Sequence, residues 1–363
     1  MEFTFSDIIK KRSVKTALKL TIPLAFVFAL WGCSFPRQKI YTSTIFSMDT
    51  VMELQVAGDK DYTPEAESYI RQLEKELSVT DSDSQIAKLN ADGRGELSVE
   101  VTDILKGALN VCSRTNGALD ITIYPVLKAW GFTTGDYRVP SDEELKSLLT
   151  SVDYRNVTVE LSSEQGEKAG GTSLVTLEDG MMLDLGSVVK GYTGTAVAER
   201  LKSLGVTHAL LNLGGNVQCI GTKPTGDRWK VAIKSPFSDS TSGMLGVIKA
   251  DDVAIITSGG YERFFEEDGK IYWHILDPDT GKPADNGLVS VTIVGKDGLL
   301  CDGLSTALFV KGLDEAVDIW RASNDFEAVF VTGDRQVYVT EGLIDDFELT
   351  SEYHDIALHV IDR

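Results

Sequence analysis

The stretch "GMMLDLGSVVKGYTGTAVAERLKSLGVTHALLNLGGNVQCIG" (residues 180–221) carries the clearest fold signal in the chain. An apolar run ends at Gly186, and a helix follows whose apolar face comprises Val197, Leu201 and Leu204. Gly205 ends this helix, and a further apolar run then begins. The stretch is therefore predicted to form a strand, a glycine turn, a helix and a second strand.

Strand-like segments dominate the rest of the second half. Segments that are apolar and rich in β-branched residues are predicted as strands over residues 229–236, 244–259, 270–277 and 289–295. One or two helices are predicted over 301–323, and a terminal hairpin over 327–343. Because many strands occur without regular alternation with helices, we predict an α+β fold with mixed or antiparallel sheets and flanking helices.

The first half is less regularly patterned. In the second of its two predicted helices, Thr102 or Asp103 is expected to cap the start and Gly117 to end it. The predicted elements are, in chain order, an early strand, a helix, a polar turn-rich stretch, the second helix, and a region of peripheral hairpins and loops: residues 40–58, 63–78, 78–96, 98–120 and 132–180.

The net charge of the 363-residue chain is −20, and it is unevenly distributed. Residues 1–33 contain five of the 35 basic and two of the 55 acidic residues, so the remainder carries a net charge of −23. So acidic a body repels phosphate backbones, and no nucleic-acid binding is expected. Any anionic ligand would need a local cation, a helix N-terminus or a metal ion.

The N-terminus has the pattern of a targeting segment. A basic region ends at Lys19, and an apolar core of about a dozen residues follows, which suits a signal peptide better than a membrane span. "LWGC" (residues 30–33) resembles a bacterial lipobox with Cys33 as the lipidated residue, although Trp31 stands where a small residue is usual. The alternative is an uncleaved anchor. Both interpretations place the body at the extracytoplasmic face of the cell membrane.

Three constellations suggest chemistry, each with a simpler alternative. Asp302 and Thr306 are four residues apart, so on a helix they share a face and offer two oxygens to Mg²⁺. Taken alone, the pair is more simply explained by an aspartate N-cap and a threonine bonded back to its own helix. Lys190, near Gly186 and a helix start, forms either an anion site or a solvated surface lysine.

The third constellation is "NGALDITIYPVLKAWGF" (residues 116–132). Asp120 lies close in sequence to Trp130 and Phe132, and aromatic rings beside a carboxylate can hold a flat heterocycle. Core aromatics around a capped turn explain the segment alone more simply. His274, in "YWHILDPDTGKP" (residues 272–283), raises a separate question: whether it packs, binds metal or handles a proton.

Together these segments resemble the ApbE family, the FAD:protein FMN transferases, over roughly residues 42–345. The matching stretches occur in family order: "SMDTVMEL", "ALDITIYPVLKAWGF", "LDLGSVVKGYTGTAVAERL", "NLGGNV", "TSGGYERFF", "YWHILDPDTGKPADNGLVSVTIV" and "CDGLSTALFVKG". The resemblance implies a flavin transferase domain over 42–350, preceded by a signal peptide (1–33) and a tether (34–41). Residues 351–363 would form a C-terminal tail.

The resemblance also implies the site. Asp302 and Thr306 would bind Mg²⁺ through their side chains and Ser187 through its backbone carbonyl. His274 would lie beside the reaction centre and accept a proton or orient the nucleophile. The residues implied to contact FAD are Met48, Ala118, Leu119, Asp120, Asp184, Lys190 and Leu276.

The implied reaction is Mg²⁺-dependent transfer of FMN from FAD onto a Ser or Thr hydroxyl of a partner protein, with release of AMP. Two departures from the family pattern bear on it. Asp49 replaces the glycine of the family's "MGT", and Thr80 stands where an aromatic residue often covers the flavin, so Tyr124 or Trp130 would have to replace that cover. Two alternatives are a Mg²⁺-dependent FAD pyrophosphatase and a non-catalytic flavin-binding lipoprotein.

Overall fold

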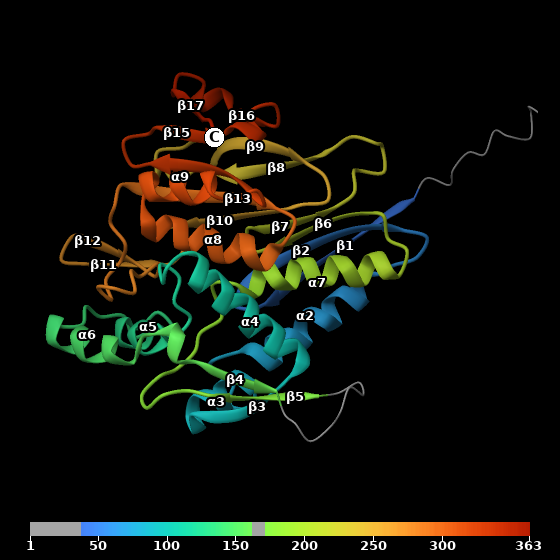
Figure 1. The fold of residues 1–363 in the computed structure, drawn as a ribbon. Helices are drawn as coiled ribbons and strands as arrows, with labels where there is room; N and C mark the ends of the chain where they lie inside the picture. The colour runs from blue at the N-terminus through green and yellow to red at the C-terminus, as the bar shows by residue number, and fades with distance from the viewer. Residues whose placement is uncertain (1–37, 162–170) are drawn as a thin grey trace, which may run out of the picture. The chain divides into compact units, whose positions relative to one another are not determined.

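A nine-stranded sheet forms the centre of the structure (Figure 1). The computed structural model describes residues 38–161 and 171–363. Neighbouring strands are antiparallel except for the last pair, β15 and β17, which is parallel. In spatial order the strands are β1 (Lys39–Ser47), β2 (Thr50–Gly58), β6 (His208–Leu213), β7 (Asn216–Ile220), β10 (Ala254–Gly259), β13 (Leu288–Gly295), β14 (Phe326–Thr332), β15 (Val337–Thr340) and β17 (Leu358–Ile361).

Both faces of this sheet are buried around β14, whereas β1 and the start of β2 keep one face exposed. In β14, Ala328 and Phe330 pack against the helices, whereas Val329 and Val331 pack against a smaller sheet, as the alternation of side chains along a strand requires. The helices are α2 (Thr63–Leu77), α7 (Val189–Ser203), α8 (Gly298–Lys311) and α9 (Leu313–Arg321). The smaller sheet comprises, in order, β16 (Phe347–Leu349), β9 (Met244–Ala250) and β8 (Trp229–Lys234).

A third sheet and its helices pack beside α2 and α8 around a shared apolar cluster. Its strands are β3 (Arg94–Ser98), β5 (Thr172–Thr176) and β4 (Thr158–Leu161), and its helices are α3 (Gln85–Asp92) and α4 (Val99–Arg114). The remaining elements are α5 (Tyr124–Trp130), α6 (Asp142–Leu148), the hairpin of β11 (Phe264–Glu267) and β12 (Lys270–Trp273), and the short turns η1 (Leu149–Ser151), η2 (Tyr154–Asn156), η3 (Glu341–Leu343) and η4 (Ser351–Tyr353).

The predicted α+β class with antiparallel and mixed sheets is confirmed. The single strand predicted over 40–58 is wrong, because β1 and β2 form a hairpin in which Ser47 pairs with Thr50. Met48 and Asp49 form its two-residue turn with φ of 50° and 59°. Such turns usually contain Asn-Gly or Asp-Gly, so this sequence lacked the usual signal.

The strand predicted before Gly186 is wrong, since residues 180–186 form no strand. The single strand predicted over 244–259 is also wrong, because β9 and β10 belong to different sheets.

Local capping explains differences at the helix starts. Ser98, rather than Thr102 or Asp103, caps α4, because its hydroxyl accepts the backbone N–H of Val101 at 3.3 Å. The polar stretch 78–96 contains α3, whose N-terminus is capped in the same way by Ser84. The helix α7 ends at Ser203, so Leu204 is exposed and does not belong to the apolar face.

The ends of the domain also differ from prediction. The predicted tail, 351–363, instead extends the central sheet, since Leu358 of β17 pairs with Val337 of β15. Lys39 to Tyr41 of the predicted tether belong to β1. The signal peptide and Cys33 lie outside the described residues. None of the described helices is both long and apolar enough to cross a membrane.

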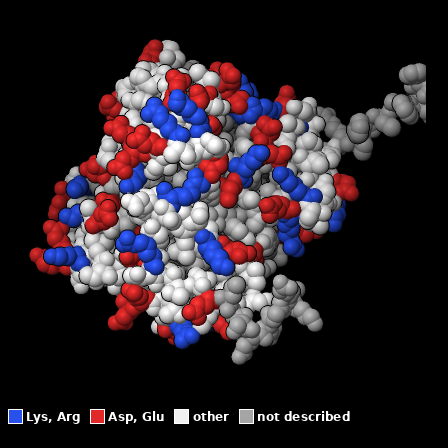
Figure 2. Space-filling view, in the orientation of Figure 1, with Lys and Arg blue, Asp and Glu red and all other residues white. Residues whose placement is uncertain are grey.

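Charged side chains of both signs are interspersed on the face drawn in Figure 2. Among the ion pairs of the described residues, Arg228 pairs with Asp251 at 2.8 Å and also with Asp346. Exposed pairs of this kind contribute at most about 1 kcal/mol each.

Candidate active site

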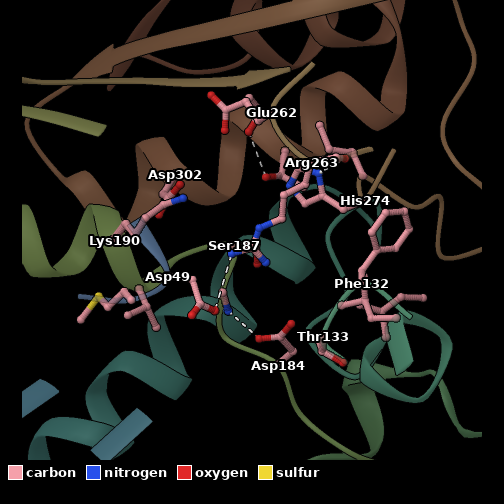
Figure 3. Close-up of a pocket in the computed structure, with 18 of the residues that line it drawn as sticks. Asp49, Phe132, Thr133, Asp184, Ser187, Lys190, Glu262, Arg263, His274 and Asp302 are labelled. Carbon is pink, nitrogen blue, oxygen red and sulfur yellow. Dashed lines mark hydrogen bonds and ion pairs between the residues drawn. The ribbon is translucent and has the colours of Figure 1, made fainter. Parts of the chain in front are cut away.

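A cavity of about 670 Å³ opens between the central sheet, α7, α8 and the segment that precedes α5. Figure 3 shows side chains from distant parts of the sequence converging on it. Every residue predicted for the site lines this cavity: Met48, Ala118, Leu119, Asp120, Asp184, Ser187, Lys190, His274, Leu276, Asp302 and Thr306. The structure thus brings the whole predicted set together.

The close crossing of α7 and α8 builds the side of the cavity that contains Asp302. A Cβ atom on Gly191 would lie 2.0 Å from the carbonyl oxygen of Gly298, and one on Gly298 would lie 2.2 Å from that of Gly191. Only glycine therefore permits this approach. It allows the backbone N–H of Gly191 to donate to Oδ2 of Asp302 at 2.8 Å.

Asp302 does not cap α8, as the simpler explanation required. Asp297 is the N-cap, and its carboxylate accepts the backbone N–H of Leu300 at 3.2 Å. Asp302 lies within the helix, only 5% exposed, and faces the cavity. Burial raises its pKa to about 6, against the lowering effects of Lys190 and the Gly191 N–H. A buried carboxylate of this kind would gain from a cation partner.

Two cationic side chains and six carboxylates line the cavity. Lys190 lies in the first turn of α7, where the helix dipole adds to its positive charge. Arg263 follows β10 and forms a long, 3.7 Å ion pair with Asp49 of the β1–β2 turn. The carboxylates are Asp49, Glu74, Asp120, Asp184, Glu262 and Asp302. Lys190, predicted either for an anion site or as a solvated surface lysine, thus lies at the cavity together with Arg263.

His274 lies directly after β12, at the rim of the cavity (Figure 3). Both its backbone N–H and its Nδ1 approach the carbonyl oxygen of Arg263, at 3.1 and 3.2 Å. Because a carbonyl only accepts hydrogen bonds, Nδ1 carries the ring proton and Nε2 keeps a free lone pair. Burial, with Arg263 and Lys190 nearby, lowers the pKa of His274 to about 4. The neutral ring can therefore accept a proton at neutral pH.

The turn after His274 is rigid. Asp277 Oδ1 accepts the backbone N–H of Asp279 at 2.9 Å, and the carbonyl of Asp277 accepts that of Gly281 at 2.7 Å. Trp130 donates its indole N–H to the carbonyl of Gly281 at 2.7 Å, which ties the turn to α5. The turn that follows His274 is thus held by several hydrogen bonds, one of which comes from α5.

Asp120 and Asp184 are held by their own loops. Asp120 accepts hydrogen bonds from the Thr122 backbone N–H, the Thr122 hydroxyl and the Tyr154 backbone N–H at 2.8, 2.6 and 2.9 Å. Asp184 accepts the backbone N–H of Gly186 at 2.8 Å. Burial raises the pKa of each carboxyl group. These two residues shape the cavity walls as well as lining them.

The expectation that Tyr124 or Trp130 supplies the aromatic flavin cover missing at Thr80 is wrong. Trp130 and Tyr124 do not line the cavity, since Trp130 is buried against Tyr272 with ring centroids 5.3 Å apart. Tyr124 points its hydroxyl toward the carbonyl of Val79. The aromatic residues that do line the cavity are Phe46, Phe132 and Tyr137, and Thr80 lines it as well.

Sequence reasoning missed several lining residues, among them Glu74, Asn216, Ser258, Glu262 and Arg263. Asn216 directly follows the Gly214–Gly215 pair, within the matching stretch "NLGGNV". Its side-chain amide lies close enough to Asp302 to help lower the pKa of that carboxyl group against the effect of burial. Glu74 accepts the Met48 backbone N–H at 2.6 Å and the Ser47 hydroxyl at 2.7 Å, so it braces the β1–β2 turn.

Comparisons with known proteins agree with this geometry. The family model of the ApbE family matches residues 48–330. An FAD:protein FMN transferase from Vibrio cholerae is 30% identical over 312 residues, which are 83% of this chain and 90% of that protein. Another from Treponema pallidum is 32% identical over 314 residues, which are 83% of this chain and 84% of that protein.

Solved structures show the same fold. An ApbE protein from Thermotoga maritima matches with a TM-score of 0.74 at 30% identity, covering 84% of this chain and 98% of its own. The flavinyl transferase ApbE of Pseudomonas stutzeri matches with a TM-score of 0.71 at 28% identity, covering 88% of this chain and 97% of its own. From the family match, the relatives and the shared fold, we conclude that this chain belongs to the ApbE family.

Proposed function

We propose that this protein transfers FMN from FAD onto a Ser or Thr hydroxyl of a partner protein and releases AMP. The observation that carries the proposal is the convergence of Lys190, His274, Asp302 and Thr306 on one cavity. The volume of about 670 Å³ lies within the range of pockets that bury a small molecule. The family relatives bear the name of the same activity.

In the proposed reaction, the acceptor hydroxyl oxygen forms a bond to the phosphorus atom on the riboflavin side of the diphosphate. The bond between that phosphorus and the bridging oxygen breaks, and AMP leaves with the bridging oxygen. Nε2 of His274 takes the hydroxyl proton, since its lone pair is free and the ring is neutral. Lys190 offsets the negative charge of the diphosphate.

The donor set around Asp302 fits Mg²⁺. The residues that would hold the ion offer oxygen only: the Asp302 carboxylate, the Thr306 hydroxyl and the Ser187 carbonyl. Within the described ranges no group of three or more His, Cys, Asp or Glu side chains gathers to hold a metal ion, so the proposed donor set relies on hydroxyl and carbonyl oxygens beside a single carboxylate. Mg²⁺ commonly binds one or two carboxylates and keeps waters and phosphate oxygens as its other ligands. When bound, it would polarise the phosphoryl group.

Incubation of the protein with FAD, Mg²⁺ and a candidate acceptor protein, followed by mass spectrometry of the acceptor, tests the proposal. A mass increase of one FMN on a Ser or Thr is the expected result. Rapid release of AMP without any acceptor would instead identify a pyrophosphatase. FAD that binds and never turns over would identify a flavin-binding protein.

We also propose that the protein is lipid-anchored through Cys33 at the extracytoplasmic face of the membrane. The proposal is supported by the sequence of residues 1–33 alone. An anchored enzyme would meet acceptor proteins that are themselves in or on the membrane.

A further inference from the structure

Three hydroxyl groups form a hydrogen-bonded chain that begins at Thr306, one of the proposed cation ligands. Thr306 Oγ1 lies 3.2 Å from Ser258 Oγ, which lies 2.8 Å from Ser305 Oγ. The Ser305 hydroxyl donates to the backbone carbonyl of Asp302 at 2.8 Å. Ser258 comes from β10, whereas the other three groups belong to α8. The chain therefore links the sheet to the helix at the point where both face the cavity.

The direction of this chain follows from counting protons. A carbonyl oxygen can only accept, so the one proton of Ser305 is committed to Asp302. Ser305 must then accept the proton of Ser258, which leaves Ser258 with no proton for Thr306. The remaining contact can be a hydrogen bond only if Thr306 donates to Ser258. Every hydroxyl proton in the chain thus points the same way.

We propose that Ser258 is a positioning residue that keeps the Thr306 hydroxyl proton directed at Ser258 and therefore away from a cation bound beside Asp302. The oxygen lone pairs of Thr306 then face the cavity beside the Asp302 carboxylate, which is the orientation a cation requires. This inference rests on the proposed function, because it assigns a role within the same cation site. Without Ser258, the Thr306 hydroxyl could rotate and present its proton to the ion.

The residues around the three hydroxyl groups help to keep their protons in this one direction. Ser305 is completely buried, so water does not compete for its hydrogen bonds. Asp302 takes part twice. Its backbone carbonyl accepts the proton of Ser305, and its carboxylate is the proposed cation ligand next to Thr306. Groups that orient metal ligands in this way commonly change metal affinity by about 10-fold or more when removed.

The test measures metal affinity in the purified protein, with Mn²⁺ followed by electron paramagnetic resonance and Mg²⁺ by its displacement of Mn²⁺. Ser258→Ala is expected to weaken binding by about 10-fold. Ser258→Thr, which keeps the hydroxyl, is expected to retain wild-type affinity. Ser305→Ala is also expected to weaken cation binding. Without the Ser305 hydroxyl, Ser258 can donate its proton to Thr306, which reverses the direction of the Thr306–Ser258 hydrogen bond.

A Thr306→Val background separates positioning from a general structural effect. In that background the Ser258→Ala change is expected to have no further effect on affinity, because the ligand it orients is already gone. Wild-type affinity in Ser258→Ala, or an equal loss with and without Thr306, would overturn the inference while leaving the cation site itself intact. Failure of the wild-type protein to bind either ion would overturn the proposed cation site and this inference together.

Discussion

Gly191 donates its backbone N–H to the Asp302 carboxylate at 2.8 Å across the crossing of α7 and α8. The bond fixes the carboxylate in a buried position beside Lys190. It can form because Gly191 and Gly298 have no side chains, which lets the two helices approach closely. The geometry of the candidate site is thus set by helix packing as much as by the reactive residues themselves.

The first prediction concerns this crossing. Gly191→Ala is expected to lower the free energy of unfolding by about 1–3 kcal/mol, because its Cβ would lie 2.0 Å from a backbone oxygen that belongs to the opposite helix. Gly95→Ala is the matched control, since its Cβ would meet nothing nearer than 3.8 Å. Urea denaturation of the two variants would contradict the packing argument if both lost the same stability.

A second prediction concerns Thr80 at the cavity wall. Thr80→Tyr is expected to tighten FAD binding about 3- to 10-fold, because an aromatic ring at this place can stack on the flavin or adenine. Thr80→Ser is the control for a change at the position without a ring. Fluorescence titration with FAD measures both, and unchanged affinity in Thr80→Tyr would mean that Phe132 and Tyr137 already provide the stacking surface.

The third prediction is a pH dependence of stability from His274. Its pKa is about 4 in the folded protein against an ordinary value of 6.5, so the unfolded chain takes up the proton first as the pH falls. The stability contribution is therefore complete above pH 6.5 and is lost between pH 6.5 and 4. At pH 5 the wild-type protein should have lost about 1–2 kcal/mol relative to His274→Gln.

The raised pKa of Asp302 makes the protein more stable as the pH falls, over nearly the same pH range in which His274 makes it less stable. Comparison with His274→Gln isolates the contribution of His274. Denaturation at pH 7 and pH 5 measures the difference, with His354→Gln, at an exposed histidine, as the control. Equal losses in the wild type and His274→Gln would show that the ring is not held neutral by the fold.

The fourth prediction concerns the anchor. Cys33→Ser is expected to move the protein from the membrane fraction to the soluble fraction, or to leave an uncleaved precursor. Ser34→Ala is the neighbouring control and should remain membrane-bound. Retention of Cys33→Ser at the membrane with a cleaved N-terminus would contradict lipid anchoring at this residue.

Local sequence spacing predicted the parts of the site that lie on single elements. Asp302 and Thr306 share a face of α8 because they are four residues apart, and Lys190 falls in the first turn of α7 after a glycine turn. The resemblance added Met48, Ala118 and Leu276 as residues implied to contact FAD, which residue type alone does not indicate.

The sequence could not predict contacts made only in the folded chain. Asn216 and Ser258 reach the site through the sheet order β7–β10, and Glu74 reaches the β1–β2 turn from α2. The hairpin turn at Met48 and Asp49 escaped prediction because a distant carboxylate, rather than a turn-favouring residue type, stabilises it. The extension of the central sheet by β17 likewise depends on a parallel pairing that no local pattern indicates.

The most direct measurement of the central claim is the mass of an acceptor protein after incubation with FAD, Mg²⁺ and either the wild-type enzyme or Asp302→Asn. Asp285→Asn serves as a control of equal charge change at an exposed position. We predict an FMN adduct on a Ser or Thr with the wild type and with Asp285→Asn, and none with a folded Asp302→Asn protein. Flavinylation by Asp302→Asn at the wild-type rate would contradict the account.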